Sequence, residues 1–205
     1  TAGTVGHGLT STPELITVKN MDYSSGNWYT WTPDLTTNKV IFLNAANNQT
    51  SSANAFTEGD ITATTIGVGT ERVTNGSGSG EDLLAYVFHS VDGFSKMGKY
   101  VGNGSSNGTF VYTGFRPAWL LMKTISGADR WVLFDSARSI ANPVEDKHEL
   151  NPSDNTAEGT GTTECFDFLS NGFKLRRTGN VFNTGSRDYI YMAFAESPFK
   201  FANAR

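Results

Sequence analysis

Two tryptophans have surroundings that suit sugar binding. Proteins usually hold a sugar by an exposed aromatic ring under the pyranose face, with amide and carboxylate groups around it. Trp28 alternates with threonines along its segment, Trp131 shares a strand face with Asp135, and Asn-rich loops begin at Asn44 and Asn151. The alternative is that both tryptophans pack beneath loops at the edge of the fold. The carbohydrate-binding candidates are Trp28, Asn44, Trp131, Asp135, Asn151 and Tyr191.

One predicted loop holds four carboxylates, Glu145, Asp146, Asp154 and Glu158. Hard cations such as Ca²⁺ bind several carboxylate and carbonyl oxygens supplied by loops. Asp146 and Asp154 are therefore candidates for a calcium site, with a solvated acidic loop as the simpler interpretation. Calcium is the one cofactor that the sequence leaves open.

The sequence contains no evident catalytic group. His7, His89 and His148 lie in different contexts and lack the spacing of a metal motif such as His-Glu-x-x-His. Glycoside hydrolysis needs two carboxylates about 5–9 Å apart. Glu164 and Asp167 have an odd spacing, which puts them on opposite faces of a strand. The chain is therefore not expected to be an enzyme, and a glycan-cleaving depolymerase stays open as the enzymatic alternative.

Composition argues against several other classes. The formal charge is only −4, and no run of Lys or Arg offers a phosphate-binding surface, so no nucleic acid partner is expected. The single cysteine, Cys165, rules out an internal disulfide and a multi-cysteine metal site. No stretch reaches the roughly 20 apolar residues of a membrane span, and no cationic and then apolar leader begins the chain. Neither membrane insertion nor export by its own signal is expected.

The elements that would position these residues occur twice along the chain. Four segments recur in the same order, with offsets that drift only between 103 and 107 residues. Such an ordered series is hard to obtain by chance and indicates an internal duplication. The matched segments are residues 13–19 with 117–123, 27–31 with 130–134, 43–44 with 150–151, and 82–88 with 188–194.

Alternate residues of the matched segments predict the core, because side chains two residues apart share one face of a strand. The predicted core positions are Ile16, Val18, Tyr29, Trp31, Leu84, Tyr86 and Phe88 in the first copy, and Leu120, Met122, Val132, Phe134, Ile190, Met192 and Phe194 in the second. The opposite face of the second copy is too apolar to meet only water. We expect loops or a neighbouring copy to cover its residues Trp119, Leu121, Trp131, Leu133, Tyr189 and Tyr191.

The fold class follows from the turns. Residues that tolerate turn conformations, mainly Gly, Asn and Ser, separate the segments at close intervals, and no stretch shows sustained helical periodicity. About six strands per copy predict an all-β protein with two packed antiparallel sheets, a β-sandwich. We assign the first repeat to residues 1–101 and the second to residues 102–205. We interpret them as two halves of one domain with a shared core, and two small separate barrels are the alternative.

Several long motifs are distinctive: GFSKMGKY at 93–100, VYTGFRPAW at 111–119, DFLSNGFK at 167–174 and YIYMAFAE at 189–196. Together they resemble an uncharacterised domain family of structural and tail-fibre-like proteins of marine bacteriophages, over nearly the whole chain. The resemblance implies a β-sandwich of the concanavalin A-like lectin type, a jelly roll, carried on the virion as an extracellular particle. It implies no functional residues.

The resulting expectation is a non-enzymatic recognition domain of a phage tail fibre that binds host-surface carbohydrate. A purely structural virion module without glycan binding is the main alternative, and the depolymerase is the other. The expected partners are a host-surface glycan and other virion proteins or copies of the chain itself. The opening residues 1–4 resemble the interior of the linker at 102–109, so we also expect the chain to be cut from a longer polypeptide.

Overall fold

The computed structural model describes residues 1–76, 80–150, 159–160, 165–179 and 181–197. In these ranges the chain forms sixteen strands, one short α-helix and one 3-10 helix. The strands pair antiparallel in four sheets, so the protein is all-β, as the sequence predicts. None of the described helices has the length and apolar character needed to cross a membrane.

The chain divides into two compact units, an N-terminal unit of Thr1–His89 and a C-terminal unit of Ser90–Arg205. This boundary corrects the one expected between residues 101 and 102. Strand β8 (Ser95–Val101), which we assigned to the first repeat, pairs along its whole length with β16 (Asp188–Ala195) of the second. The repeat gave no basis for that assignment, because the sequence of β8 has no match within residues 1–89.

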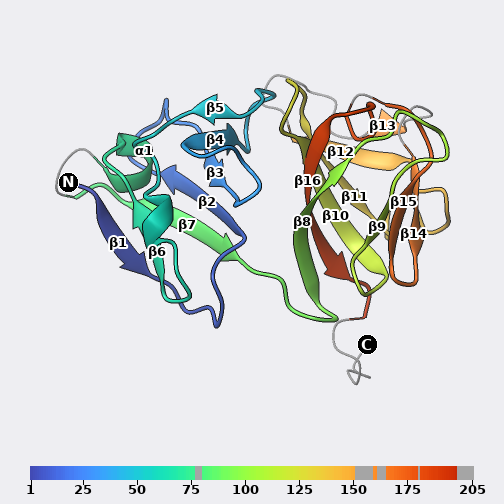
Figure 1. Cartoon of the computed structure of the whole chain (residues 1–205), viewed down its shortest axis with the longest axis horizontal. Coiled ribbons are helices and arrows are strands. Elements are labelled where there is room, and N and C mark those ends of the chain that lie inside the picture. The colour runs from blue at the N-terminus through green and yellow to red at the C-terminus, as the bar shows by residue number, and fades with distance from the viewer. Residues whose placement is uncertain (77–79, 151–158, 161–164, 180, 198–205) are drawn as a thin grey trace. The chain divides into compact units, whose positions relative to one another are not determined.

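The N-terminal unit, coloured blue to green in Figure 1, has two layers of strands. Its larger sheet has five strands in the order β5-β4-β3-β2-β7. They are β2 (Leu15–Asn20), β3 (Tyr29–Trp31), β4 (Lys39–Phe42), β5 (Thr50–Ser51) and β7 (Leu83–Phe88). The second layer contains β1 (Gly3–Gly6) and β6 (Thr65–Val68), and short helices lie at Glu58–Asp60 and at α1 (Arg72–Asn75).

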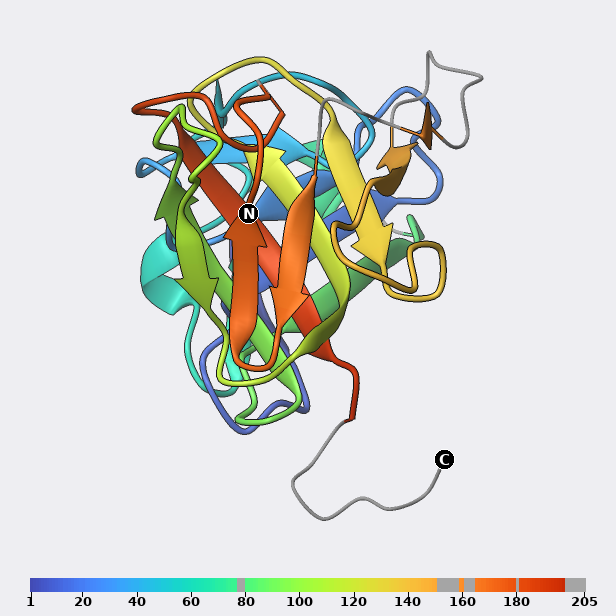
Figure 2. The same ribbon diagram turned by 90° about the vertical axis from the view of Figure 1, so that its right-hand side faces the viewer.

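The C-terminal unit repeats this architecture with one more strand in each layer. Its larger sheet has the order β13-β12-β11-β10-β16-β8, and its smaller sheet has the order β14-β15-β9. In Figure 2 the orange strands β14 and β15 lie in front of the larger sheet. The remaining strands are β9 (Phe110–Tyr112), β10 (Pro117–Thr124), β11 (Trp131–Asp135), β12 (Asp146–Leu150), β13 (Gly159–Thr160), β14 (Phe166–Leu169) and β15 (Gly172–Leu175).

Both units share one strand order, which confirms the internal duplication. The series β5-β4-β3-β2-β7 corresponds to β13-β12-β11-β10-β16. In the second layer, the pairing of β1 with β6 in the N-terminal unit corresponds to the pairing of β9 with β15 in the C-terminal unit. The pairing of β14 with β15 is represented in the N-terminal unit by an isolated bridge between Phe56 and Val68. Only β8 lacks a counterpart among the described residues of the N-terminal unit.

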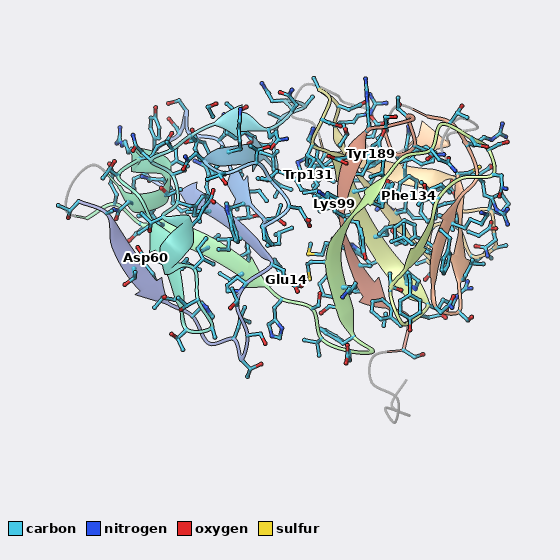
Figure 3. All side chains as sticks on the ribbon, viewed as in Figure 1. Glu14, Asp60, Lys99, Trp131, Phe134 and Tyr189 are labelled. Atoms are coloured by element: carbon cyan, nitrogen blue, oxygen red, sulfur yellow. The ribbon has the colours of Figure 1, made fainter. Side chains whose placement is uncertain are left out.

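Aromatic rings fill the space between the two sheets of the C-terminal unit. Phe134 and Tyr189 point into this space from the larger sheet (Figure 3). Phe166 of the smaller sheet meets Phe134, Phe168 and Phe173 edge-on, with ring centroids 4.6, 5.0 and 6.1 Å apart. Each such ring buries a large apolar surface, so this cluster is the main hydrophobic contribution to the stability of the unit.

The N-terminal unit encloses a separate and smaller core, so each half has its own core instead of sharing one. Strands of both layers contribute to it. Its members are Ile16, Val18, Trp31, Val40, Phe42, Ala55, Phe56, Ile61 and Ile66.

The predicted core faces are correct for the first two matched strands of each copy and wrong for the last. On β7, Val87 lies directly opposite Ile16 and therefore shares its core face. On β16, Ala193 lies opposite Leu120 in the same way. The residues expected in the core from these strands therefore point to the opposite face, where Ile190 and Met192 are nonetheless buried. The six residues are Leu84, Tyr86, Phe88, Ile190, Met192 and Phe194.

Candidate functional site

An aromatic pair lies on the outer face of the larger sheet of the N-terminal unit, the face opposite its core. Trp28, just before β3, and Tyr86 of β7 have rings inclined by only 10°, with centroids 6.2 Å apart. Trp28 is half-buried, and Tyr86 is 48% exposed. The pair therefore presents an aromatic surface that solvent reaches.

The strand register explains why the two rings meet. Strand β2 runs between β3 and β7, and Thr17 of β2 lies opposite both Thr30 and Tyr86. Thr17 and Thr30 are buried, and their hydroxyl oxygens form a hydrogen bond of 2.9 Å. Because these threonines are short, the rings of Trp28 and Tyr86 extend over β2 from its two sides, within the diagonal reach of aromatic side chains in a sheet.

Two asparagine side chains lie beside Trp28. The main-chain N–H of Trp28 donates to Oδ1 of Asn44 at 2.9 Å, and Nδ2 of Asn44 donates to Oδ1 of Asn27 at 3.1 Å. Among the described residues, Nδ2 of Asn27 donates to no acceptor. Asn44 therefore fixes the backbone that carries Trp28, while Asn27 keeps hydrogen-bond donors for a ligand.

Lys19 adds a cation to the same outer face. Its Nζ donates to the main-chain oxygens of Asn20 at 2.7 Å and Tyr23 at 2.8 Å. The site thus combines a flat apolar surface with amide, phenol and ammonium groups. Such a set can bind a ring-shaped, hydroxyl-rich ligand, and it contains no carboxylate pair that could act as acid and base.

Of the predicted carbohydrate residues that the structure describes, it brings two together, Trp28 and Asn44. Tyr191 is buried in the core of the C-terminal unit, with its ring centroid 5.4 Å from that of Phe173. Trp131 lies on the other face of that sheet (Figure 3) and is only 1% exposed, so it is not an accessible platform. Both corrections have the same cause, since the sequence does not reveal which strand face is covered.

The face expected from Trp119, Leu121, Trp131, Leu133, Tyr189 and Tyr191 does not exist as one surface. The two tyrosines belong to the core of the C-terminal unit. The other four residues, on β10 and β11, share the opposite face.

The remaining candidates lie apart from the aromatic pair. Asp135 accepts the main-chain N–H of Arg138 at 2.9 Å and forms an ion pair with its guanidinium, so this carboxylate holds a turn. Asp146 accepts a hydrogen bond from the hydroxyl of Ser139 at 2.9 Å. Within the described residues, no group of three or more acidic, His or Cys side chains is arranged to hold a metal ion. Asn151 and Asp154 lie outside the described residues.

Sequence reasoning missed Asn27, Lys19 and, most importantly, Tyr86 as site residues. Tyr86 was missed because the alternation placed it on the core side. Both faces of β7 are apolar, so periodicity alone could not decide between them. The available signal was the threonine face of β2 and β3. The residue directly opposite Tyr86 is the short Thr17, which leaves room above β2 for an aromatic ring.

A pocket of about 590 Å³, lined mainly by polar and charged residues, lies within the C-terminal unit. Nε of Arg176 donates to Oδ2 of the buried Asp167 at 2.6 Å. The pocket brings two carboxylates, Glu145 and Asp167, to one place, although they belong to different segments. Its lining consists of Ser106, Asn142, Pro143, Glu145, Cys165, Asp167, Arg176 and Arg177.

The C-terminal unit contains a buried equivalent of Lys19. Lys123 of β10 is fully buried, and its Nζ donates to the main-chain oxygen of Asp129. Burial lowers the pKa of Lys123 to about 8, and the nearby carboxylate of Asp129 opposes this shift only in part. The ordinary lysine pKa is 10.5, so the folded unit releases this proton at a lower pH than the unfolded chain does.

We expect the stability of the C-terminal unit to rise between about pH 7.5 and about pH 9.5. Below this window Lys123 is protonated in both the folded and the unfolded chain, so the full cost of burying its charge lowers the free energy of unfolding. Within it, the unfolded chain binds more protons, so the free energy of unfolding should increase by roughly 2 kcal/mol. Urea unfolding at the two pH values measures this rise. Lys123→Met should remove it, and an unchanged rise in that variant would contradict the assignment.

The fold and the aromatic site define a duplicated antiparallel β-sandwich protein with an aromatic and amide surface patch on its N-terminal unit. The chain belongs to the family described as a domain of unknown function (DUF7483), whose model matches residues 1–198. No curated protein and no solved structure matches the chain.

Proposed function

We propose that the protein is a non-enzymatic carbohydrate-recognition module, with its binding site at Trp28 and Tyr86. The observation that carries the proposal is the solvent-accessible aromatic pair, with nearly parallel rings 6.2 Å apart beside the short side chains of Thr17 and Thr30. A pyranose ring presents one face of C–H groups, which packs on an aromatic surface, and a rim of hydroxyls. The amide of Asn27 and the phenol of Tyr86 match that rim.

The setting that we propose is the host surface, with the module displayed on a phage fibre as part of the virion. The motif resemblance to tail-fibre-like proteins of marine phages favours this setting, as does an all-β architecture with a second layer on each sheet. A concanavalin A-like jelly roll belongs to the same proposal. Host-surface glycan is the proposed ligand, and other virion proteins or further copies of the chain are the proposed neighbours.

A glycan array probed with the full chain tests the proposal. We expect saturable binding to a restricted set of surface polysaccharides, with free sugar competing at millimolar concentrations because a single shallow site binds weakly. Retention of no glycan at high protein concentration would contradict carbohydrate binding. It would favour the alternative of a purely structural virion module.

The pocket of the C-terminal unit supports the second alternative, a glycan-cleaving depolymerase, because Glu145 and Asp167 both line it. The contact between Asp167 and Arg176 argues against this role, because Oδ2 of Asp167 already accepts a hydrogen bond from the guanidinium and is not directed at a substrate. Release of reducing ends from a polysaccharide found on the array, abolished by Glu145→Gln, would establish the depolymerase. We expect no release.

A further inference from the structure

We propose that the free edge of β7 accepts an additional antiparallel strand, supplied by a polypeptide segment with the side-chain pattern of β8. In the C-terminal unit the equivalent strand, β16, pairs with β10 on one side and with β8 on the other. Strand β7 pairs with β2, and within the described part of the chain no strand pairs with its other edge. The larger sheet of the N-terminal unit therefore corresponds to that of the C-terminal unit without its edge strand β8.

Residues that β8 would cover are exposed in the N-terminal unit. The strand registers make Leu83 the equivalent of Tyr189, and Leu83 is 38% exposed whereas Tyr189 is fully buried. In the second layer, Val5 of β1 is the equivalent of Val111 of β9. Val5 is 51% exposed and Val111 only 7%. Both of these differences in exposure lie on the side where β8 covers the C-terminal unit.

An apolar groove of about 490 Å³ lies at this position. In the C-terminal unit the corresponding space holds the ring of Tyr100 from β8. This ring stacks on Tyr189 at a centroid distance of 5.1 Å and meets Phe173 edge-on at 5.9 Å. The groove has room for a ring in the same place, and its apolar lining is Val5, Leu9, Ile66, Ala85 and Val87.

The edge itself has none of the features that normally prevent strand addition. Natural edge strands carry Lys, Pro or a bulge, or they are short. Strand β7 has the sequence LLAYVF, with no charge and no proline, and it pairs with β2 over six consecutive residues without a register shift. Such an edge offers main-chain hydrogen bonds to a partner strand, and the groove offers selectivity for its side chains.

The groove favours a β8-type strand over a second copy of β7. Strand β8 carries Tyr100 on its inner face and Gly98 two residues earlier, with Gly98 against the ring of Tyr191. The equivalent of Tyr191 is Ala85, so the incoming strand meets less crowding here than β8 does. Pairing of β7 with β7 of another copy would bring only the aliphatic Leu83, Ala85 and Val87 on the core face, and the position of the Tyr100 ring would stay empty.

A capped synthetic peptide with the sequence of residues 94–101, FSKMGKYV, tests the proposal when titrated into the full chain. We expect saturable binding that slows amide hydrogen exchange within Leu83–Phe88 and in β1. Ala85→Lys places a charge at the groove and should weaken binding by about tenfold or more. The matched control is Met21→Lys, at another exposed apolar residue, and should leave binding unchanged. A peptide with Asp in place of Tyr100 should not bind.

Three results would overturn the proposal. One is that the peptide fails to slow exchange in Leu83–Phe88. Another is that Ala85→Lys, folded by circular dichroism, binds the peptide as the unchanged protein does. The third is that the free chain is a dimer that Ala85→Lys converts to a monomer, which would make a second copy the occupant of the edge.

Discussion

Replacing Tyr86 with alanine is expected to weaken binding of any glycan retained on the array by about tenfold or more, equivalent to roughly 1.4 kcal/mol. The ring is 48% exposed and forms half of the aromatic surface, so its loss removes the contact with the sugar face and leaves Trp28 alone. Isothermal titration with the unchanged protein and the variant measures the difference. Trp28→Ala should have an effect at least as large, because the indole is the larger ring.

Tyr112→Ala is the matched control for this prediction. Tyr112 lies on β9 of the C-terminal unit and is 65% exposed, so the substitution also removes an exposed tyrosine ring. It should leave glycan affinity unchanged. Equal losses in Tyr86→Ala and Tyr112→Ala would contradict a site at the aromatic pair, because they would indicate binding through scattered surface tyrosines.

Phe173→Ala is expected to destabilise the C-terminal unit by about 3–5 kcal/mol. Phe173 is fully buried, and its ring meets Tyr100, Phe166 and Tyr191 at centroid distances of 5.9, 6.1 and 5.4 Å. Removing it leaves a cavity among aromatic rings that cannot collapse easily. Urea unfolding followed by amide hydrogen exchange should show lost protection in β9, β15 and β16.

The same experiment tests whether each unit has its own core. Protection of β2, β3 and β4 should persist in Phe173→Ala, because these strands pack around the separate cluster of the N-terminal unit. Phe110→Ala, at a half-exposed ring on the neighbouring strand β9, is the control and should cost much less. Equal loss of protection in both units of Phe173→Ala would contradict two separate cores.

Much of the fold could be predicted because the duplication tested each pattern twice. Ile16 and Leu120 occupy equivalent, buried positions, and the order of the matched segments became the common strand order of both sheets. The position of β8 could not be predicted. Its partner, β16, lies far away in the sequence, and no repeated segment exists to indicate the pairing.

The candidate site could be predicted only in part. Trp28 and Asn44 were found because a tryptophan among threonines and a nearby Asn-rich loop are local features of the sequence. Tyr86 and Tyr191 were assigned to the wrong faces, because both faces of their strands are apolar. The correct faces follow from the pairing of Ile16 with Val87 and of Met122 with Tyr191, and such registers are long-range properties.

Nuclear magnetic resonance of the tryptophan side chains tests the central claim most directly. The chain contains four tryptophans, so a ¹⁵N-labelled sample gives four indole N–H signals, assigned by single substitutions. On titration with a glycan retained on the array, the account predicts that the signal of Trp28 shifts and saturates. Those of the buried Trp31 and Trp131 should stay in place. A bound glycan that shifts the other indole signals and leaves Trp28 unmoved would contradict the account.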